Sequence, residues 1–193
     1  MREPLHLIIV SYPSRLDATL EEIAHTLIRG ASARRVVERA QEPSDVRFLV
    51  RQWHLRDRDV RTLDLIGHGG PGKFKLGDEL LFGEGSGLEL IDEWRPWLPA
   101  RATLRLLGCS VAGEEPEGHE LLSKVASRLS PGSRVVAPTR ALFTIDYAAG
   151  GLTPRASRCL KSSTTQGRHH HGSTKSKTSQ QPRQAQSHHA AGR

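Results

Sequence analysis

Apolar runs typical of buried strands alternate along this chain with stretches that have the spacing of amphipathic helices. The runs occupy residues 5–11, 63–66 and 103–107, and each ends at residues that favour a loop. Between the first two runs, residues 16–28 place Leu, Ile and Ala at intervals of three and four. This alternation is the order of a mainly parallel sheet with helices on both faces, so we predict an α/β fold.

The same criteria predict the other elements. A β-hairpin is expected around Gly77 and Asp78, where apolar residues lie on either side of a turn. Residues 46–53 suit either a strand or a short helix. The remaining predictions are helices at residues 33–40, 88–97 and 116–129, and strands at residues 134–137 and 142–147.

The charge is uneven along the chain and divides it in two. Of 28 Lys and Arg residues, 8 lie in residues 151–193, which hold no Asp or Glu, so the net charge of +7 comes from this segment. Ser, Thr, Gln and His dominate there, and apolar periodicity stops, which predicts a disordered basic tail after a domain at residues 1–150. Only the tail is suited to weak contact with a polyanion.

Cysteine content and the N-terminal sequence bear on the compartment. Cys109 and Cys159 are expected to be free thiols in a reducing environment, since two cysteines do not form a disulfide framework. The N-terminal apolar run is too short for a signal sequence with a cleavage site, and no run approaches a membrane span. We therefore expect a cytoplasmic protein.

Two chemically reactive side chains follow neighbouring apolar runs. His68-Gly69 comes after residues 63–66, and Gly108-Cys109 comes after residues 103–107. Open α/β sheets keep their ligand crevices at the carboxyl ends of strands, so His68 and Cys109 face one cleft if the two strands are neighbours. A thiol there, with a base and backbone N–H groups, is what nucleophilic catalysis by cysteine needs.

At these residues the chain resembles the caspase-like (clan CD) cysteine peptidases, and more closely a bacterial branch, the domain of unknown function DUF4347. The similarity lies in two sequences, IGHGGPGKFKLG at residues 66–77 and LLGCSVA at residues 106–112, with Gly118 and an apolar helix downstream. The resemblance covers roughly residues 5–148. It implies a three-layer caspase/hemoglobinase-like fold.

The resemblance also implies a mechanism. Cys109 would attack a peptide carbonyl, and His68 would protonate the leaving amine. The N–H groups of Gly69 and Cys109 would bind the developing oxyanion, while Gly108 lets the chain turn sharply at the strand end. A peptide or protein is the implied substrate, with no cofactor and no metal.

The chain departs from caspases proper in two respects. The Gln-Ala-Cys-x-Gly pattern around the nucleophile is absent. No specificity pocket is identifiable in the sequence, although two charged residues follow the predicted strand at residues 134–137. Arg140 would favour an acidic substrate side chain and Asp146 a basic one, and the sequence does not decide between them.

Other polar residues are assigned ordinary roles. The glycines at residues 69–72 lack the Gly-Lys-Ser or Gly-Lys-Thr of a phosphate-binding loop. The acidic residues 114, 115 and 117 are expected to cap a helix. Histidines 6, 25, 54 and 119 have no metal-ligand spacing, and those of the tail would bind a metal only weakly.

Three functions remain open from the sequence. The first is a cysteine endopeptidase with a His68/Cys109 dyad. The second is a catalytically inactive protein-interaction module with the same fold. The third is a binder of nucleic acid or another anionic surface that acts through the tail.

Overall fold

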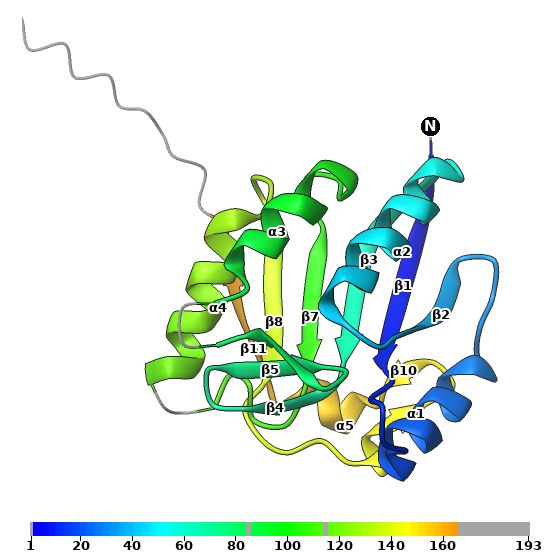
Figure 1. Ribbon diagram of the computed structural model, residues 1–193, viewed down its shortest axis with the longest axis vertical. Helices are drawn as coiled ribbons and strands as arrows, with labels where there is room; N and C mark the ends of the chain where they lie inside the picture. The colour runs from blue at the N-terminus through cyan, green and yellow to red at the C-terminus, as the bar shows by residue number, and fades with distance from the viewer. Residues whose placement is uncertain (1, 84–85, 114–115, 166–193) are drawn as a thin grey trace, which may run out of the picture.

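The computed structural model describes residues 2–83, 86–113 and 116–165, and its centre is a six-stranded sheet (Figure 1). The strands are β1 (Glu3–Ser11), β2 (Arg35–Ala40), β3 (Arg58–Ile66), β7 (Thr103–Leu107), β8 (Arg134–Pro138) and β11 (Leu160–Thr164). Their order is β11-β8-β7-β3-β1-β2. All neighbours pair in parallel except β11, which is antiparallel to β8. The predicted mainly parallel α/β fold is confirmed.

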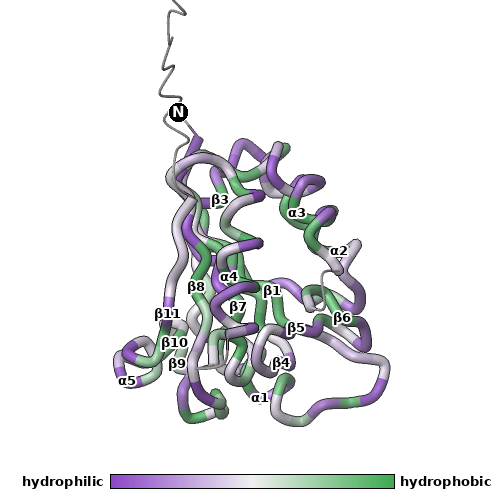
Figure 2. The backbone as a smooth tube through the Cα atoms, turned by 90° about the vertical axis from the view of Figure 1, so that its left-hand side faces the viewer, coloured by the Kyte–Doolittle hydropathy of each residue, from purple (hydrophilic) through white to green (hydrophobic). Residues whose placement is uncertain are grey.

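Helices cover both faces of this sheet, as Figure 2 shows from the side. One face packs against α2 (Pro43–Leu55), α3 (Leu88–Trp94) and α4 (Pro116–Arg128). The other packs against α1 (Ala18–Ile28) and the short α5 (Pro154–Ser157). Because successive side chains of a strand point to opposite faces, the continuous apolar run of β1 serves both cores. Leu5, Leu7 and Ile9 enter the first, whereas Ile8 and Val10 enter the second.

A small antiparallel sheet follows β3 and lies beside the carboxyl ends of the central strands. It consists of β4 (His68–Gly70), β5 (Lys73–Leu76) and β6 (Glu79–Phe82). The hairpin predicted around Gly77 and Asp78 is therefore confirmed, and Phe74, Leu76 and Phe82 anchor it in the first core.

Three predictions of secondary structure need correction or a decision. Residues 33–40, predicted as a helix, contain strand β2, because Val36 and Val37 supply apolar contacts to opposite faces of the sheet. Residues 46–53 belong to helix α2, which has Pro43 in its first turn. Residues 142–147, predicted as a strand, form the 3-10 turn η2 (Thr144–Asp146) and the start of β9 (Tyr147–Ala148).

The C-terminal boundary of the domain also differs from the prediction. Residues 151–165, predicted to be disordered, form β10 (Gly151–Leu152), α5 and β11. Strand β11 is polar in sequence, but its backbone pairs with β8 at the sheet edge, and Ala156 of α5 is fully buried. Backbone hydrogen bonds do not require an apolar sequence, so hydropathy alone missed this strand. The tail prediction for residues 166–193 lies outside the described residues.

The helix predictions for residues 88–97 and 116–129 are confirmed by α3, continued by the 3-10 turn η1 (Arg95–Trp97), and by α4. Among the described residues, none of the helices has the length and apolar character needed to cross a membrane.

Candidate active site

His68 and Cys109 follow strands that are direct neighbours. Strands β3 and β7 pair in parallel, and their last pair joins Ile66 to Leu107. Each strand is followed by one glycine and then by the candidate side chain, so both residues leave the sheet at the same edge and the same level. In Figure 1 this edge lies at the lower end of β3 and β7, beside β4. The sequence prediction of a shared strand-end position is confirmed.

The glycines of the two motifs are explained by the contact between their backbones. A Cβ atom on Gly108 would lie 2.9 Å from the carbonyl oxygen of His68 and 3.0 Å from the nitrogen of Gly69. A Cβ atom on Gly69 would lie 2.5 Å from Cγ2 of Val111 and 3.1 Å from the nitrogen of Cys109. Side chains at either position would push the two loops apart. Glycine therefore brings the histidine loop against the cysteine loop.

The Cys109 loop is fixed by bonds to the segment after β8. The half-buried Cys109 thiol donates to the carbonyl oxygen of Leu142 over 3.6 Å, a weak bond. Ser110, with a left-handed φ of 53°, donates its N–H to the carbonyl of Arg140 at 3.0 Å. The N–H of Cys109 has no acceptor within the three described segments. This donor is therefore available to a ligand.

His68 is held by Asp17, a residue that the sequence analysis did not place in the site. The Nε2 atom of His68 lies 2.8 Å from Oδ2 of Asp17, while Oδ1 of Asp17 accepts the N–H of Leu20 at the start of α1. A carboxylate only accepts hydrogen bonds, so Nε2 carries the proton and Nδ1 is left for other chemistry. The His68 side chain is 53% exposed. No hydrogen bond joins His68 to Cys109 in the described parts of the chain.

The electrostatics of Asp17 support a lasting contact with His68. Burial acts to raise the pKa of Asp17, but hydrogen bonds from Leu20 and His68, together with the charge of His68, outweigh it and lower that pKa. Asp17 is therefore a carboxylate at neutral pH. The signal in the sequence was an acidic residue in the loop after the first strand, because that loop ends at the same sheet edge as His68.

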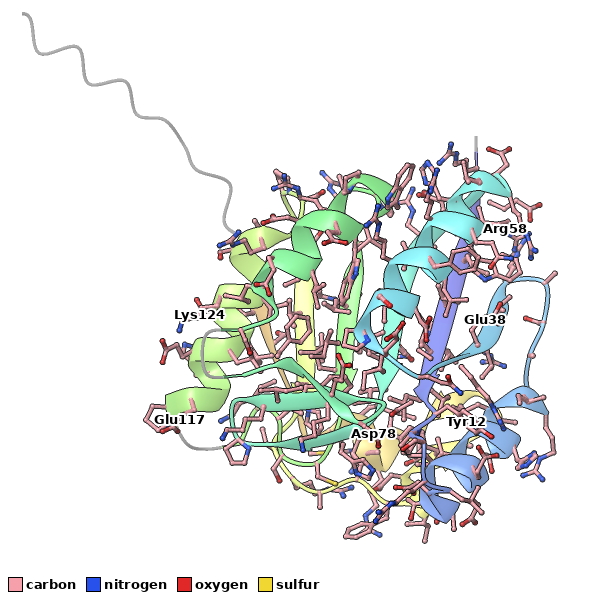
Figure 3. All side chains as sticks on the ribbon, in the orientation of Figure 1. Tyr12, Glu38, Arg58, Asp78, Glu117 and Lys124 are labelled. Atoms are coloured by element: carbon pink, nitrogen blue, oxygen red, sulfur yellow. The ribbon has the colours of Figure 1, made fainter. Side chains whose placement is uncertain are left out.

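His68 opens into a cavity of about 300 Å³ whose wall carries two positive and two negative side chains. Besides Asp17 and His68, its lining includes Arg15, Lys75 and Asp78. Figure 3 shows Asp78 near the lower end of the sheet, to the left of Tyr12. Cys109 does not line this cavity.

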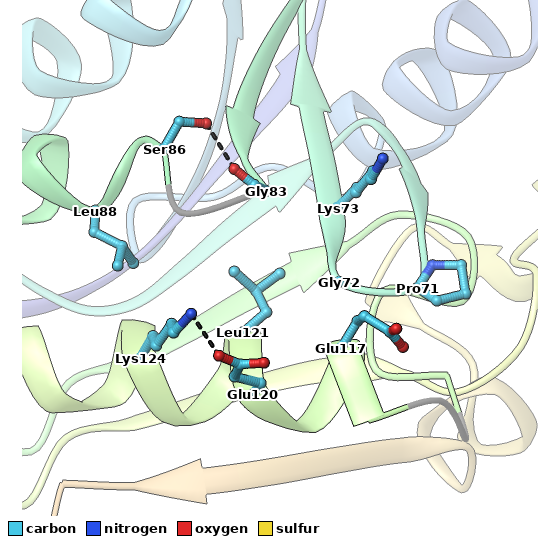
Figure 4. Close-up of a pocket in the computed structure, with 10 residues that line it drawn as sticks. All are labelled: Pro71, Gly72, Lys73, Gly83, Ser86, Leu88, Glu117, Glu120, Leu121 and Lys124. Carbon is cyan, nitrogen blue, oxygen red and sulfur yellow. Dashed lines mark hydrogen bonds and ion pairs between the residues drawn. The ribbon is translucent and has the colours of Figure 1, made fainter.

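A second cavity of about 300 Å³ lies between the β5–β6 hairpin and α4, and Pro71 and Gly72 form part of its lining (Figure 4). Glu117 and Glu120 line it from α4, and Lys124 binds Glu120 at 2.6 Å. Glu117 lies in the first turn of α4, as predicted, whereas residues 114 and 115 lie outside the described segments. Cys109 is not among the residues that line this cavity either.

The two candidate specificity residues bind each other. Arg140 donates from Nη1 and Nη2 to the two carboxylate oxygens of Asp146, at 2.9 and 2.8 Å. Asp146 is buried, and its hydrogen bond with Arg140 is the main reason that its pKa is lowered. The same bond raises the pKa of Arg140. Neither charge is free to select a substrate of opposite sign.

The other histidines occupy structural or surface positions. His6 belongs to a cluster in which Nε2 lies 2.8 Å from Oδ2 of Asp64, and Arg105 binds the same carboxylate through Nε and Nη2. His54 stacks edge-on against Trp97, and burial followed by the charge of Arg2 lowers its pKa. Within residues 2–83, 86–113 and 116–165, no group of three or more acidic, His or Cys residues is placed to hold a metal ion.

Comparison with known families places this site in a defined class of domain. Residues 16–142 match the family model described as "Domain of unknown function (DUF4347)", and they include Asp17, His68 and Cys109. The chain belongs to this family. Searches of the curated proteins and of the solved structures give no match.

Proposed function

We propose that this DUF4347 domain is a caspase-like cysteine endopeptidase in which Cys109 is the nucleophile and His68 the general acid and base. The observation that carries the proposal is the close packing of the His68-Gly69 and Gly108-Cys109 backbones at the ends of two neighbouring parallel strands. A thiol and a half-exposed imidazole then lie on either side of a peptide bond that binds at this edge.

The proposed chemistry begins with a proton transfer between the two side chains. The Cys109 proton passes to Nδ1 of His68, and the thiolate sulfur forms a bond to the peptide carbonyl carbon. The carbonyl oxygen becomes an oxyanion, which the free N–H of Cys109 binds. The C–N bond then breaks, and the leaving amine takes the proton from Nδ1. Water, deprotonated at Nδ1, hydrolyses the acyl-enzyme and restores the thiol.

Asp17 has a positioning role in this scheme. Its Oδ2 atom fixes the imidazole through Nε2, leaves Nδ1 for proton transfer, and stabilises the imidazolium formed during each half-reaction. Its second oxygen is bound to the start of α1, so the carboxylate does not rotate away.

A protein-interaction module without turnover is the alternative function. It is favoured by the absence of a hydrogen bond between His68 and Cys109 in the described residues. In a peptidase the contact between His68 and Cys109 forms only in the complex with substrate, because catalytic hydrogen bonds that are long in the free enzyme often tighten there. In a module the two side chains would never act together.

The pH dependence of Cys109 alkylation separates these functions. The rate is measured by mass spectrometry, with Cys159, whose thiol donates to Ala156, as the internal reference. We expect Cys109 to react faster than Cys159 at neutral pH, and His68→Ala to shift its profile. The control, His25→Ala, removes an exposed imidazole of α1 and should leave the profile unchanged. A Cys109 no faster than Cys159 and indifferent to His68→Ala would favour the module.

A further inference from the structure

A cavity of about 230 Å³ is lined by the loop between β8 and β9 and by the start of α5. The residues that line it are Arg140, Phe143, Ile145, Asp146, Thr153 and Arg155. This is the loop whose Leu142 carbonyl accepts the Cys109 thiol and whose Arg140 carbonyl accepts the next N–H. A peptide held at Cys109 would therefore lie next to the loop that lines the cavity.

Three charged residues line the cavity, and two of them, Arg140 and Asp146, neutralise each other, which leaves the charge of Arg155. Arg140 and Asp146 are joined by two hydrogen bonds, and Asp146 also accepts the N–H of Phe143 at 3.1 Å. The side chains of Arg140 and Asp146 therefore stabilise the conformation of the loop. Arg155 is exposed and adds one positive charge at the rim, where a solvated ion pair with a substrate contributes little and a cationic side chain is repelled.

Two large apolar side chains of the same loop face solvent. Phe143 is 59% exposed and Ile145 is 80% exposed. Leu16, also largely exposed, lies in the loop after β1 at the same sheet edge, and α1, which follows it, contacts η2. Apolar surface gathered around a candidate site, rather than scattered, indicates a binding surface.

We infer that this cavity binds an uncharged, apolar side chain of the substrate, on the amino side of the bond attacked by Cys109. The inference rests on the proposed peptidase function for its position, and it specifies the substrate class: peptides with Leu or a similar residue before the cleavage site. Phe143 and Ile145 supply the contact, and the Arg140–Asp146 pair holds the loop that presents them.

The test measures binding apart from turnover. Capped, fluorescein-labelled alanine peptides with Leu, Asp, Arg or Ala at one central position are titrated against the full chain carrying Cys109→Ala. We expect the Leu peptide to bind about tenfold more tightly than the other three, because an apolar subsite discriminates by about this factor. In the same background, Phe143→Ser and Ile145→Ser should remove the preference. Both side chains are exposed, so folding is retained.

Leu55→Ser is the matched control, since the exposure of Leu55 lies between those of Phe143 and Ile145 but Leu55 lies at the end of α2. It should leave the preference unchanged. Equal binding of the four peptides, no binding, or tightest binding of the Asp or Arg peptide would overturn the subsite.

Cleavage of the same peptides by the unmodified chain separates the two proposals. If the Leu peptide binds but is not cleaved, the apolar subsite is supported and the peptidase function is contradicted. If a peptide with a charged residue is cleaved in preference, the peptidase function is supported and the apolar subsite is contradicted. Cleavage of the Leu peptide in preference to the others supports both.

Discussion

Two His–Asp contacts of the same length have opposite surroundings in this molecule. His6 meets Asp64 and His68 meets Asp17, each at 2.8 Å. The Asp64 side chain is only 2% exposed and is also bound by Arg105 on the neighbouring strand, so its charge is compensated without His6. Asp17 has no arginine partner among the described residues, and His68 opens into a cavity. The first contact is built for stability, whereas the second leaves an imidazole accessible.

The largest expected effect is on the free energy of unfolding, which should depend much more on Asp64 than on Asp17. Asp64→Asn removes the carboxylate that neutralises the mostly buried Arg105, so we expect a loss of about 3 kcal/mol in the free energy of unfolding. The measurement is urea denaturation, with the midpoint and slope compared to the unmodified chain. Asp17→Asn in the same assay should cost less than about 1 kcal/mol, since Asn caps helices as well as Asp does. Equal losses would remove the distinction between the two contacts.

The next effect concerns turnover and sharpens the role of Asp17. Asp17→Asn keeps the cap of α1 but replaces the carboxylate that holds His68, so kcat for a peptide substrate should fall by about 100-fold. The pH profile of Cys109 alkylation should shift in the same variant. Unchanged kcat and an unchanged profile in a folded Asp17→Asn protein would assign Asp17 to capping alone.

The smallest effect is the dependence of stability on acid. The pKa of Asp17 is lowered in the folded state, so its contribution is complete above its ordinary pKa of 3.8 and is lost as the pH falls through the lowered value. The stability gap between the unmodified chain and Asp17→Asn should therefore stay constant from pH 7 down to about 4 and narrow only below the ordinary pKa of 3.8. Urea midpoints at several pH values measure it. A gap that widens in acid would contradict the shift.

Much of the fold could be predicted because it depends on local patterns. The apolar runs of β1, β3 and β7 place strands whatever their partners are, and the spacing in α1 places a helix on one face. Strand β2 was missed because Val36 and Val37 fit a helical spacing as well as a strand that serves two faces. Strand β11 was missed because its stability comes from pairing with β8 and not from its side chains.

The sequence by itself determined that His68 and Cys109 stand at strand ends beside glycines, since hydrophobic burial fixes where each strand stops. Only the tertiary structure decided which side chains meet there. Asp17 contacts His68, from which it is separated by 51 positions in the sequence. Arg140 is hydrogen-bonded to Asp146 and not directed to a substrate. Those pairings depend on how separate loops fold over one sheet edge, and such contacts between distant residues leave no periodic pattern in a chain.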